Sequence, residues 1–140
     1  MDNLIDTFKT DHQNILNGLE RIKNIGTDYS SMSSALSDMK ETFLAHMGLE
    51  DAEFYVKLRR RVKLSLDLLR TLDFLIKDLE ELKITSLVFF EKYTHQELES
   101  LEREFAQDFH GFYDKIVRRI DLEENQLFPL FGKYIREISG

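Results

Sequence analysis

Four side chains in this sequence have the types and the spacing to bind a metal ion. They are two imidazoles, His12 and His46, and two carboxylates, Glu50 and Glu123. His46 and Glu50 are four residues apart and would share one helix face, and Glu123 stands four residues after Arg119. Imidazole and carboxylate ligands without sulfur suit iron, manganese or zinc, and helical bundles hold carboxylate-bridged metal pairs in this way. The spacing predicts a metal site for one or two ions.

Each of these residues also has a purely structural interpretation. A single histidine on an apolar helix face, such as His12, is commonly a hydrogen-bonded core residue. His46 and Glu50 fit an ordinary pair on a helix surface. An inward carboxylate, however, is costly unless it is paired or binds a metal. Spacing alone therefore leaves both the metal site and the metal-free core open.

Four amphipathic helices would position these residues, because apolar residues recur at three- and four-residue steps along the chain. We expect helices near residues 2–25, 32–59, 64–92 and 95–137. Gly26 predicts the end of the first helix, and Thr94–Glu97 has the pattern of a capping box for the fourth. The apolar stripe of the third helix carries no ligand, so we expect this helix to contribute only apolar side chains beside the polar cluster. Short connections favour an all-α, up-down-up-down four-helix bundle, a single domain over residues 1–140.

Composition excludes several classes of protein. The chain has 140 residues, 42% hydrophobic and 32% charged, with 6 Gly and 1 Pro, a profile typical of helical proteins. It has no cysteine, which excludes disulfides, thiolate metal sites and thiol nucleophiles. The net charge is −7 and the only basic run, residues 57–63, fits a helix end, so we expect no nucleic-acid partner. No apolar run approaches the roughly 20 residues of a membrane span. We expect a soluble, cytoplasmic protein without a signal peptide or a membrane partner.

An internal repeat links the second and fourth helices. Residues 46–58, "HMGLEDAEFYVKL", align without gaps on residues 119–131, "RIDLEENQLFPLF", so that Glu50 matches Glu123. With the early pair Asp11-His12, these strings resemble the hemerythrin-like family, also called the HHE cation-binding domain, over essentially the whole chain. The resemblance implies a four-helix bundle that holds a non-haem di-iron centre. It also implies a role in carrying or sensing oxygen, in responding to nitric oxide or peroxide, or in handling iron.

The sequence departs from the pattern of that family at two places. Arg119 stands where the repeat places the histidine of the fourth helix, and the third helix lacks the inward histidines of the family. His95 and His110 do not occupy positions that would replace them, and we expect both at the surface. A complete di-iron site for carrying oxygen is therefore not expected.

Arg119 leaves two alternatives for the interior. In the first, its guanidinium takes over the charge role of a metal beside Glu50 and Glu123, since arginine cannot ligate a cation but hydrogen-bonds carboxylates well. In the second, His12, His46, Glu50 and Glu123 hold a metal, iron or another divalent ion, and Arg119 bonds a ligand carboxylate.

The two alternatives predict functions of different kinds. A retained site predicts a module that binds non-haem metal, with O2 or NO as further ligands, and acts in oxygen, redox or iron response. A metal-free bundle predicts a regulatory or interaction module whose protein partner the sequence does not identify. Phosphotransfer would need an exposed histidine in mid-helix, for which His110 is the remaining candidate. No nucleophilic catalytic pattern is present, and we expect a protein that is not an enzyme.

Overall fold

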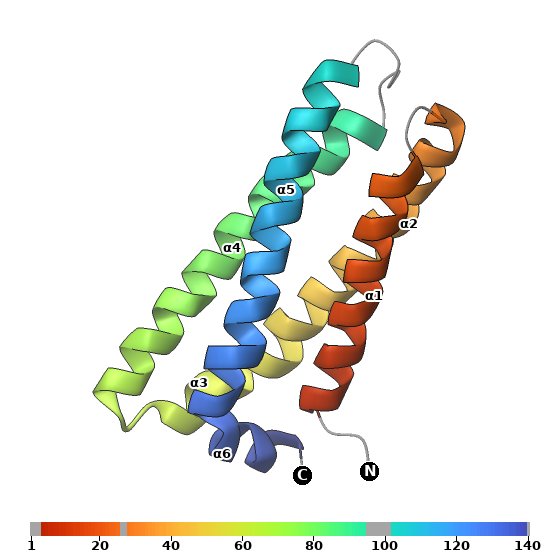
Figure 1. Cartoon of the computed structure of the whole chain (residues 1–140). Helices are drawn as coiled ribbons and strands as arrows, with labels where there is room; N and C mark the ends of the chain where they lie inside the picture. The colour runs from red at the N-terminus through yellow and green to blue at the C-terminus, as the bar shows by residue number, and fades with distance from the viewer. Residues whose placement is uncertain (1–3, 26–27, 95–101, 140) are drawn as a thin grey trace.

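The computed structural model describes residues 4–25, 28–94 and 102–139, and every regular element in these ranges is helical (Figure 1). Helix α1 spans Leu4–Ile25. Helix α2 spans Tyr29–Leu49 and continues through a π-helical stretch, η1 (Glu50–Tyr55), into α3 (Val56–Val62). Helix α4 spans Leu66–Thr94. Helix α5 (Glu102–Leu122) continues through a second π-helical stretch, η3 (Glu123–Leu127), into α6 (Phe128–Ser139).

The helices pack along their lengths into a bundle. Figure 1 shows α1 beside α2, and α4 beside α5, with α3 and α6 at the end of the bundle where α1 begins. Residues of the first helix therefore meet residues more than a hundred positions away, as in the contact of His12 with Glu123. The predicted all-α bundle is confirmed.

The predicted helix boundaries were correct to within a few residues at most ends. The second helix begins at Tyr29, earlier than expected, because the carboxylate of Asp28 caps it by accepting from the backbone N–H of Ser31 at 3.2 Å. Thr94, the first residue of the expected capping box, is the last residue of α4, and its hydroxyl donates to the carbonyl of Phe90. The partner residue of that box, Glu97, lies outside the described residues. Gly26 and residues 95–101 lie outside the described residues.

Aromatic side chains fill the core on both sides of the polar cluster. On one side Phe89 stacks on Phe112 with ring centroids 4.5 Å apart. On the other side Phe8 packs edge-on against Phe54 at 4.8 Å and against the imidazole of His46 at 5.5 Å. Each fully buried side chain of this size stabilises the fold by about 1.5–3 kcal/mol. The central polar residues between these aromatic groups are buried with them.

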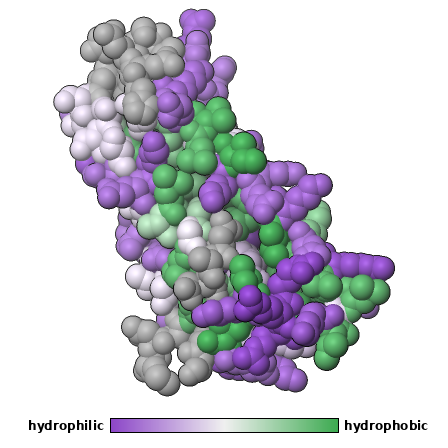
Figure 2. Space-filling model, turned by 180° about the vertical axis from the view of Figure 1, so that it is seen from behind, coloured by the Kyte–Doolittle hydropathy of each residue, from purple (hydrophilic) through white to green (hydrophobic). Residues whose placement is uncertain are grey.

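The surface is mixed in character. Figure 2, which shows the molecule from behind, has hydrophobic side chains in separate patches surrounded by hydrophilic ones. Several of the exposed apolar side chains belong to α4, among them Phe74, Ile84 and Val88. No helix in the described ranges has both the length and the apolar character needed to cross a membrane.

Candidate metal centre

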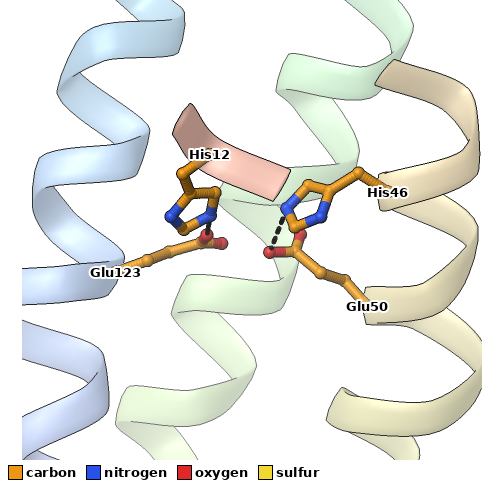
Figure 3. A group of neighbouring side chains, drawn as sticks. All are labelled: His12, His46, Glu50 and Glu123. Atoms are coloured by element: carbon orange, nitrogen blue, oxygen red, sulfur yellow. Dashed lines mark hydrogen bonds and ion pairs between the residues drawn. The ribbon is translucent and has the colours of Figure 1, made fainter. Parts of the chain in front are cut away.

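The four residues with ligand chemistry meet in the bundle interior. One ligand atom from each of His12, His46, Glu50 and Glu123 can be chosen so that all lie within 4.8 Å of one another, and all four residues are buried. Figure 3 shows the two imidazoles and the two carboxylates pointing toward one another from α1, α2, η1 and η3. Arg119 joins them, with its Nε 2.9 Å from Oε2 of Glu123. The expected proximity of these five residues is confirmed.

Both carboxylates occupy the first position of a π-helical stretch. Glu50 begins η1 and Glu123 begins η3, so the internal repeat of the sequence is also a repeat of the backbone. A π-helical turn adds one residue to the turn and rotates the following side chains relative to an α-helix, and such turns are frequent at functional sites. The apolar spacing used to predict the helices does not show this irregularity.

His12 is held between two carboxylates of the C-terminal half of the chain. Its Nε2 lies 2.8 Å from Oε1 of Glu123, and its Nδ1 lies 2.6 Å from Oε2 of Glu124. A metal-binding histidine usually hydrogen-bonds a carboxylate or carbonyl through its second ring nitrogen, which fixes the ring. The contact with Glu124 has this form.

His46 has an equivalent pair of contacts. Its Nδ1 lies 3.0 Å from Oδ2 of Asp11, and its Nε2 lies 3.0 Å from Oε1 of Glu50. The sequence analysis did not identify Asp11 or Glu124 as functional. The signal for them was their position beside His12 and Glu123 in the chain, in the pairs "DH" and "EE".

Glu50 is the least satisfied polar group of the centre. Both of its carboxylate oxygens are buried, and neither accepts a hydrogen bond from the described residues. Nε2 of His46 lies 3.0 Å from Oε1 of Glu50, which is close enough for an ion pair, but the angles at this contact are not those of a hydrogen bond. Buried polar atoms are rarely left in this state, and an unplaced ion is one of the usual reasons. The donor set fits a divalent cation at this position.

Arg119 connects Glu123 to a buried tyrosine. Its Nη2 donates to the hydroxyl of Tyr55 at 2.6 Å, and that hydroxyl donates to Oε2 of Glu123 at 3.1 Å. Oε2 of Glu123 is thus occupied by Arg119 and Tyr55, whereas Oε1 faces His12. Tyr55 aligns with Phe128 in the repeat, and the sequence analysis did not single it out.

Helix α4 contributes a polar side chain to this network. Nη1 of Arg119 donates to the carbonyl of Leu75 at 3.0 Å and to Oδ2 of Asp78 at 3.1 Å. The expectation that the third helix would offer only apolar side chains was therefore wrong. Asp78 precedes the buried Leu79, and its side chain is 47% exposed, so it reaches Arg119 from the edge of the apolar stripe while keeping contact with water.

The two central carboxyl groups differ in their affinity for protons. Burial raises the pKa of Glu50, and the charge of Glu123 raises it further. Burial also opposes the ionised form of Glu123, but the hydrogen bond to His12 and the charge of Arg119 outweigh it and lower its pKa. Burial would lower the pKa of His46, but its contacts with Glu50 and Asp11 raise the pKa to about 9. Without a metal, the centre therefore retains protons that a cation would replace.

The space between these groups is small. The interior cavity that they line has a volume of about 10 Å³. One water molecule requires about 10–15 Å³ on this measure. The cavity is of the right size for one small ion, and two ions with a bridging oxygen would require the side chains to move apart.

Of the two remaining histidines the structure describes only His110, which does not contribute to the centre. His110 is at the surface as expected, with its side chain 79% exposed and its Nε2 3.3 Å from Oδ2 of Asp114. His95 lies outside the described residues.

Comparison with known families gives a match that covers most of the chain. The family model described as the Hemerythrin HHE cation binding domain matches residues 3–131. Comparisons with curated proteins and with solved structures give no match.

Proposed function

The chain belongs to the hemerythrin HHE cation-binding domain family, and from this membership we propose that it is a binding module for one non-haem metal ion. The ligands are His12, His46, Glu50 and Glu123. Iron is the metal we propose first, and another divalent ion with a preference for nitrogen and oxygen ligands is compatible with the same set.

The observation that carries the proposal is the state of Glu50. A carboxylate with two buried oxygens, with His46 3.0 Å away but with no hydrogen bond from the described residues, is costly in a metal-free interior, and its pKa is raised accordingly. Two imidazole nitrogens and an oxygen of Glu123 lie around the same point. A cation there would satisfy Glu50 without any new contact from the protein.

The residues around the ligands have distinct roles in this proposal. Asp11 and Glu124 hold the rings of His46 and His12 through their Nδ1 atoms, which leaves Nε2 of each ring for the metal. Arg119 and Tyr55 both bond Oε2 of Glu123, so that Oε1 remains for coordination. Bound iron would supply the redox and ligand-binding chemistry of the module.

We propose further that the module acts in oxygen, redox or iron response in the cytoplasm, with O2 or NO as the small ligand of the metal. The buried, aromatic surroundings of the centre support the binding of a small ligand there. We propose binding, not catalysis, because the cavity that the described residues of this centre line is only about 10 Å³ and leaves room for a small ligand.

A second function is favoured by the bonds that Glu123 already makes. His12, Tyr55 and Arg119 all bond this carboxylate, so its charge is compensated without a metal. In this alternative the arginine has replaced the ion, and the bundle serves as a regulatory or interaction module.

Metal analysis of protein purified without chelator separates the two functions. We expect about one equivalent of metal in the wild type and none in a Glu50→Gln variant, since an amide is a poor ligand where a carboxylate is required. Glu41→Gln is the matched control, because Glu41 lies on the exposed face of α2. Wild-type protein that contains no metal and takes up none from added Fe(II) would reject the metal-binding function and leave the interaction module.

A further inference from the structure

A groove of about 480 Å³ runs along the surface between α4 and α5. Its lining includes Asp78 and Phe74 from α4, and Lys115 and Arg118 from α5. Among the described residues, Arg119 and Leu82 line both this groove and the interior cavity of the metal centre. These two side chains are thus the partition between the solvent and the centre.

Arg119, the charged residue of this partition, is bonded to a partner that solvent can replace, Asp78. The side chain of Arg119 is only 4% exposed, and its Nη1 donates to Asp78 at 3.1 Å. Asp78 stands at the groove with about half of its side chain in water, whereas the other partners of Arg119 (Glu123, Tyr55 and the carbonyl of Leu75) are buried in the bundle. Asp78 is therefore the partner of Arg119 that solvent can most readily replace.

We propose that the α4–α5 groove is a binding site for a small monovalent carboxylate-like anion of the size of formate, which gains access to the metal centre by replacing Asp78 on Arg119. The inference rests on the proposed function in one respect, since the metal centre is the destination of the anion. The binding step itself involves only Arg119, Asp78 and the groove.

The positive charge and the N–H donors of the Arg119 guanidinium favour a carboxylate-like anion over a neutral or cationic ligand. The guanidinium already donates from Nη1 to the carboxylate of Asp78, so an anion of the same charge and shape can take the place of Asp78 without leaving the buried cation unpaired. The rest of the groove is close to neutral, because Lys115 and Arg118 are balanced by Glu81 and Asp121. A cation on the same route would approach the buried charge of Arg119 in a medium of low dielectric, where the repulsion is strong.

The size limit comes from the apolar half of the partition. Leu82 is 8% exposed, and the cavity behind it holds about 10 Å³. Any anion larger than one water molecule has to displace Leu82 and the packed residues behind it to reach the centre, and a close-packed interior resists this more strongly as the anion becomes larger.

The absence of cysteine from the chain provides a test that needs no metal. Met47 is buried, lies on α2 and lines the interior cavity, so a Met47→Cys variant has one thiol behind the partition. The rate at which methyl methanethiosulfonate labels this thiol, with a chelator present, reports how often the partition opens. Leu79→Cys, which lines the same cavity from α4, is a second reporter if the first variant does not fold.

We expect Asp78→Asn in the reporter background to raise the labelling rate about tenfold, because the charged partner of Arg119 at the groove is lost. Asp73→Asn is the matched control: Asp73 lies on the same helix but pairs with Arg59 at the surface, and its rate should be unchanged. With Asp78 intact, sodium formate should accelerate labelling several-fold over sodium chloride at equal ionic strength. Equal rates for Asp78→Asn and Asp73→Asn would overturn the route past Arg119. A faster Asp78→Asn variant with no difference between formate and chloride would overturn the anion site.

These outcomes are separate from those of the proposed function. Wild-type protein that never takes up metal, together with fast labelling of Asp78→Asn and an effect of formate, rejects the metal centre and supports the anion site. Metal uptake by protein that shows neither labelling effect supports the metal centre and rejects the route.

Discussion

Asp11 on α1 holds the imidazole of His46 on α2, with its Oδ2 3.0 Å from Nδ1 of the ring, and so directs Nε2 of that ring toward Glu50. The contact joins two helices and sets the orientation of a side chain with two chemically similar nitrogens. If Nδ1 carries the proton that Asp11 accepts, Nε2 has a lone pair for a cation. The same relation holds between Glu124 and His12.

The first prediction concerns this orientation. Asp11→Ala should lower the affinity for metal about 10- to 100-fold, since the outer partner of a metal-binding histidine fixes its ring and raises its basicity. Competition against a chelating dye measures the effect. Asp38→Ala is the control, because Asp38 pairs with Arg21 at the surface. Equal affinity in the two variants would mean that Asp11 has no part in positioning a ligand.

The second prediction uses the unsatisfied state of Glu50. Without metal, Glu50→Gln should keep or raise the free energy of unfolding near neutral pH, because burial already favours the neutral form of this group. With metal at about 100 times its Kd, the wild type should gain about 2.7 kcal/mol, and Glu50→Gln should gain much less. Thermal melts with and without chelator measure both effects.

A loss of stability in metal-free Glu50→Gln, together with no effect of chelator on the wild type, would contradict this second prediction. It would show that the ionised carboxylate is itself the stabilising group, as the metal-free alternative requires. Glu41→Gln serves as the control for the substitution alone.

The third prediction concerns Arg119. Arg119→Ala should destabilise the metal-free protein by about 3–5 kcal/mol, since it leaves the buried Glu123 without its cation. Arg118→Ala changes the neighbouring, exposed arginine and should cost less than about 0.5 kcal/mol. Denaturant unfolding curves compare the two. Costs of similar size would show that the network around Glu123 does not depend on Arg119.

The fourth prediction is that Arg119→His, which adds a possible metal ligand at this position, increases metal binding. The internal repeat aligns Arg119 with His46, so this substitution restores the histidine that the family pattern places there. We expect the bound metal per chain to rise relative to the wild type, measured by mass spectrometry on protein purified side by side. Unchanged metal content would indicate that a ligand at position 119 does not reach the centre.

The sequence was sufficient to predict the convergence of the central residues because of the internal repeat. The alignment of Glu50 with Glu123 set the register of two helices, and the apolar stripes then placed His46 and Arg119 on the inward face. The outer partners Asp11 and Asp78 were missed because each is partly exposed. Whether such a side chain turns inward depends on the rotation of its helix against its neighbours, which periodicity does not define. The π-helical stretches at Glu50 and Glu123 alter that rotation locally and have no signature in the apolar spacing.

At Thr94 a local pattern coincides with the end of a longer helix. The string from Thr94 to Glu97 matches a capping box, and Glu97 lies outside the described residues. Here α4 continues through Phe90 and Tyr93, both buried, so the apolar contacts extend the helix as far as Thr94.

The last prediction concerns the pH dependence of stability. The pKa of His46 is raised from its ordinary 6.5 to about 9 in the fold, mainly because its contacts with Glu50 and Asp11 outweigh burial. A raised pKa means that the folded state holds the proton more tightly, so this stabilisation is complete below about pH 6.5 and is lost as the pH rises through about 9. Glu50, whose pKa is also raised, acts in the same direction. Glu123 has a lowered pKa, and its contribution is lost only in acid, as the pH falls below the ordinary range of a carboxyl group.

The metal-free protein should therefore lose on the order of 1–3 kcal/mol of unfolding free energy between about pH 6.5 and about pH 9. Bound metal takes the place of these protons, so the stability that metal adds should grow across the same range. Denaturant unfolding at several pH values, with metal or with chelator, measures both trends. His110→Gln is the control, because the exposed His110 lies outside the cluster and its substitution should leave the curve unchanged. A metal-free protein that becomes more stable toward pH 9 would contradict the protonated interior that His46 and Glu50 form.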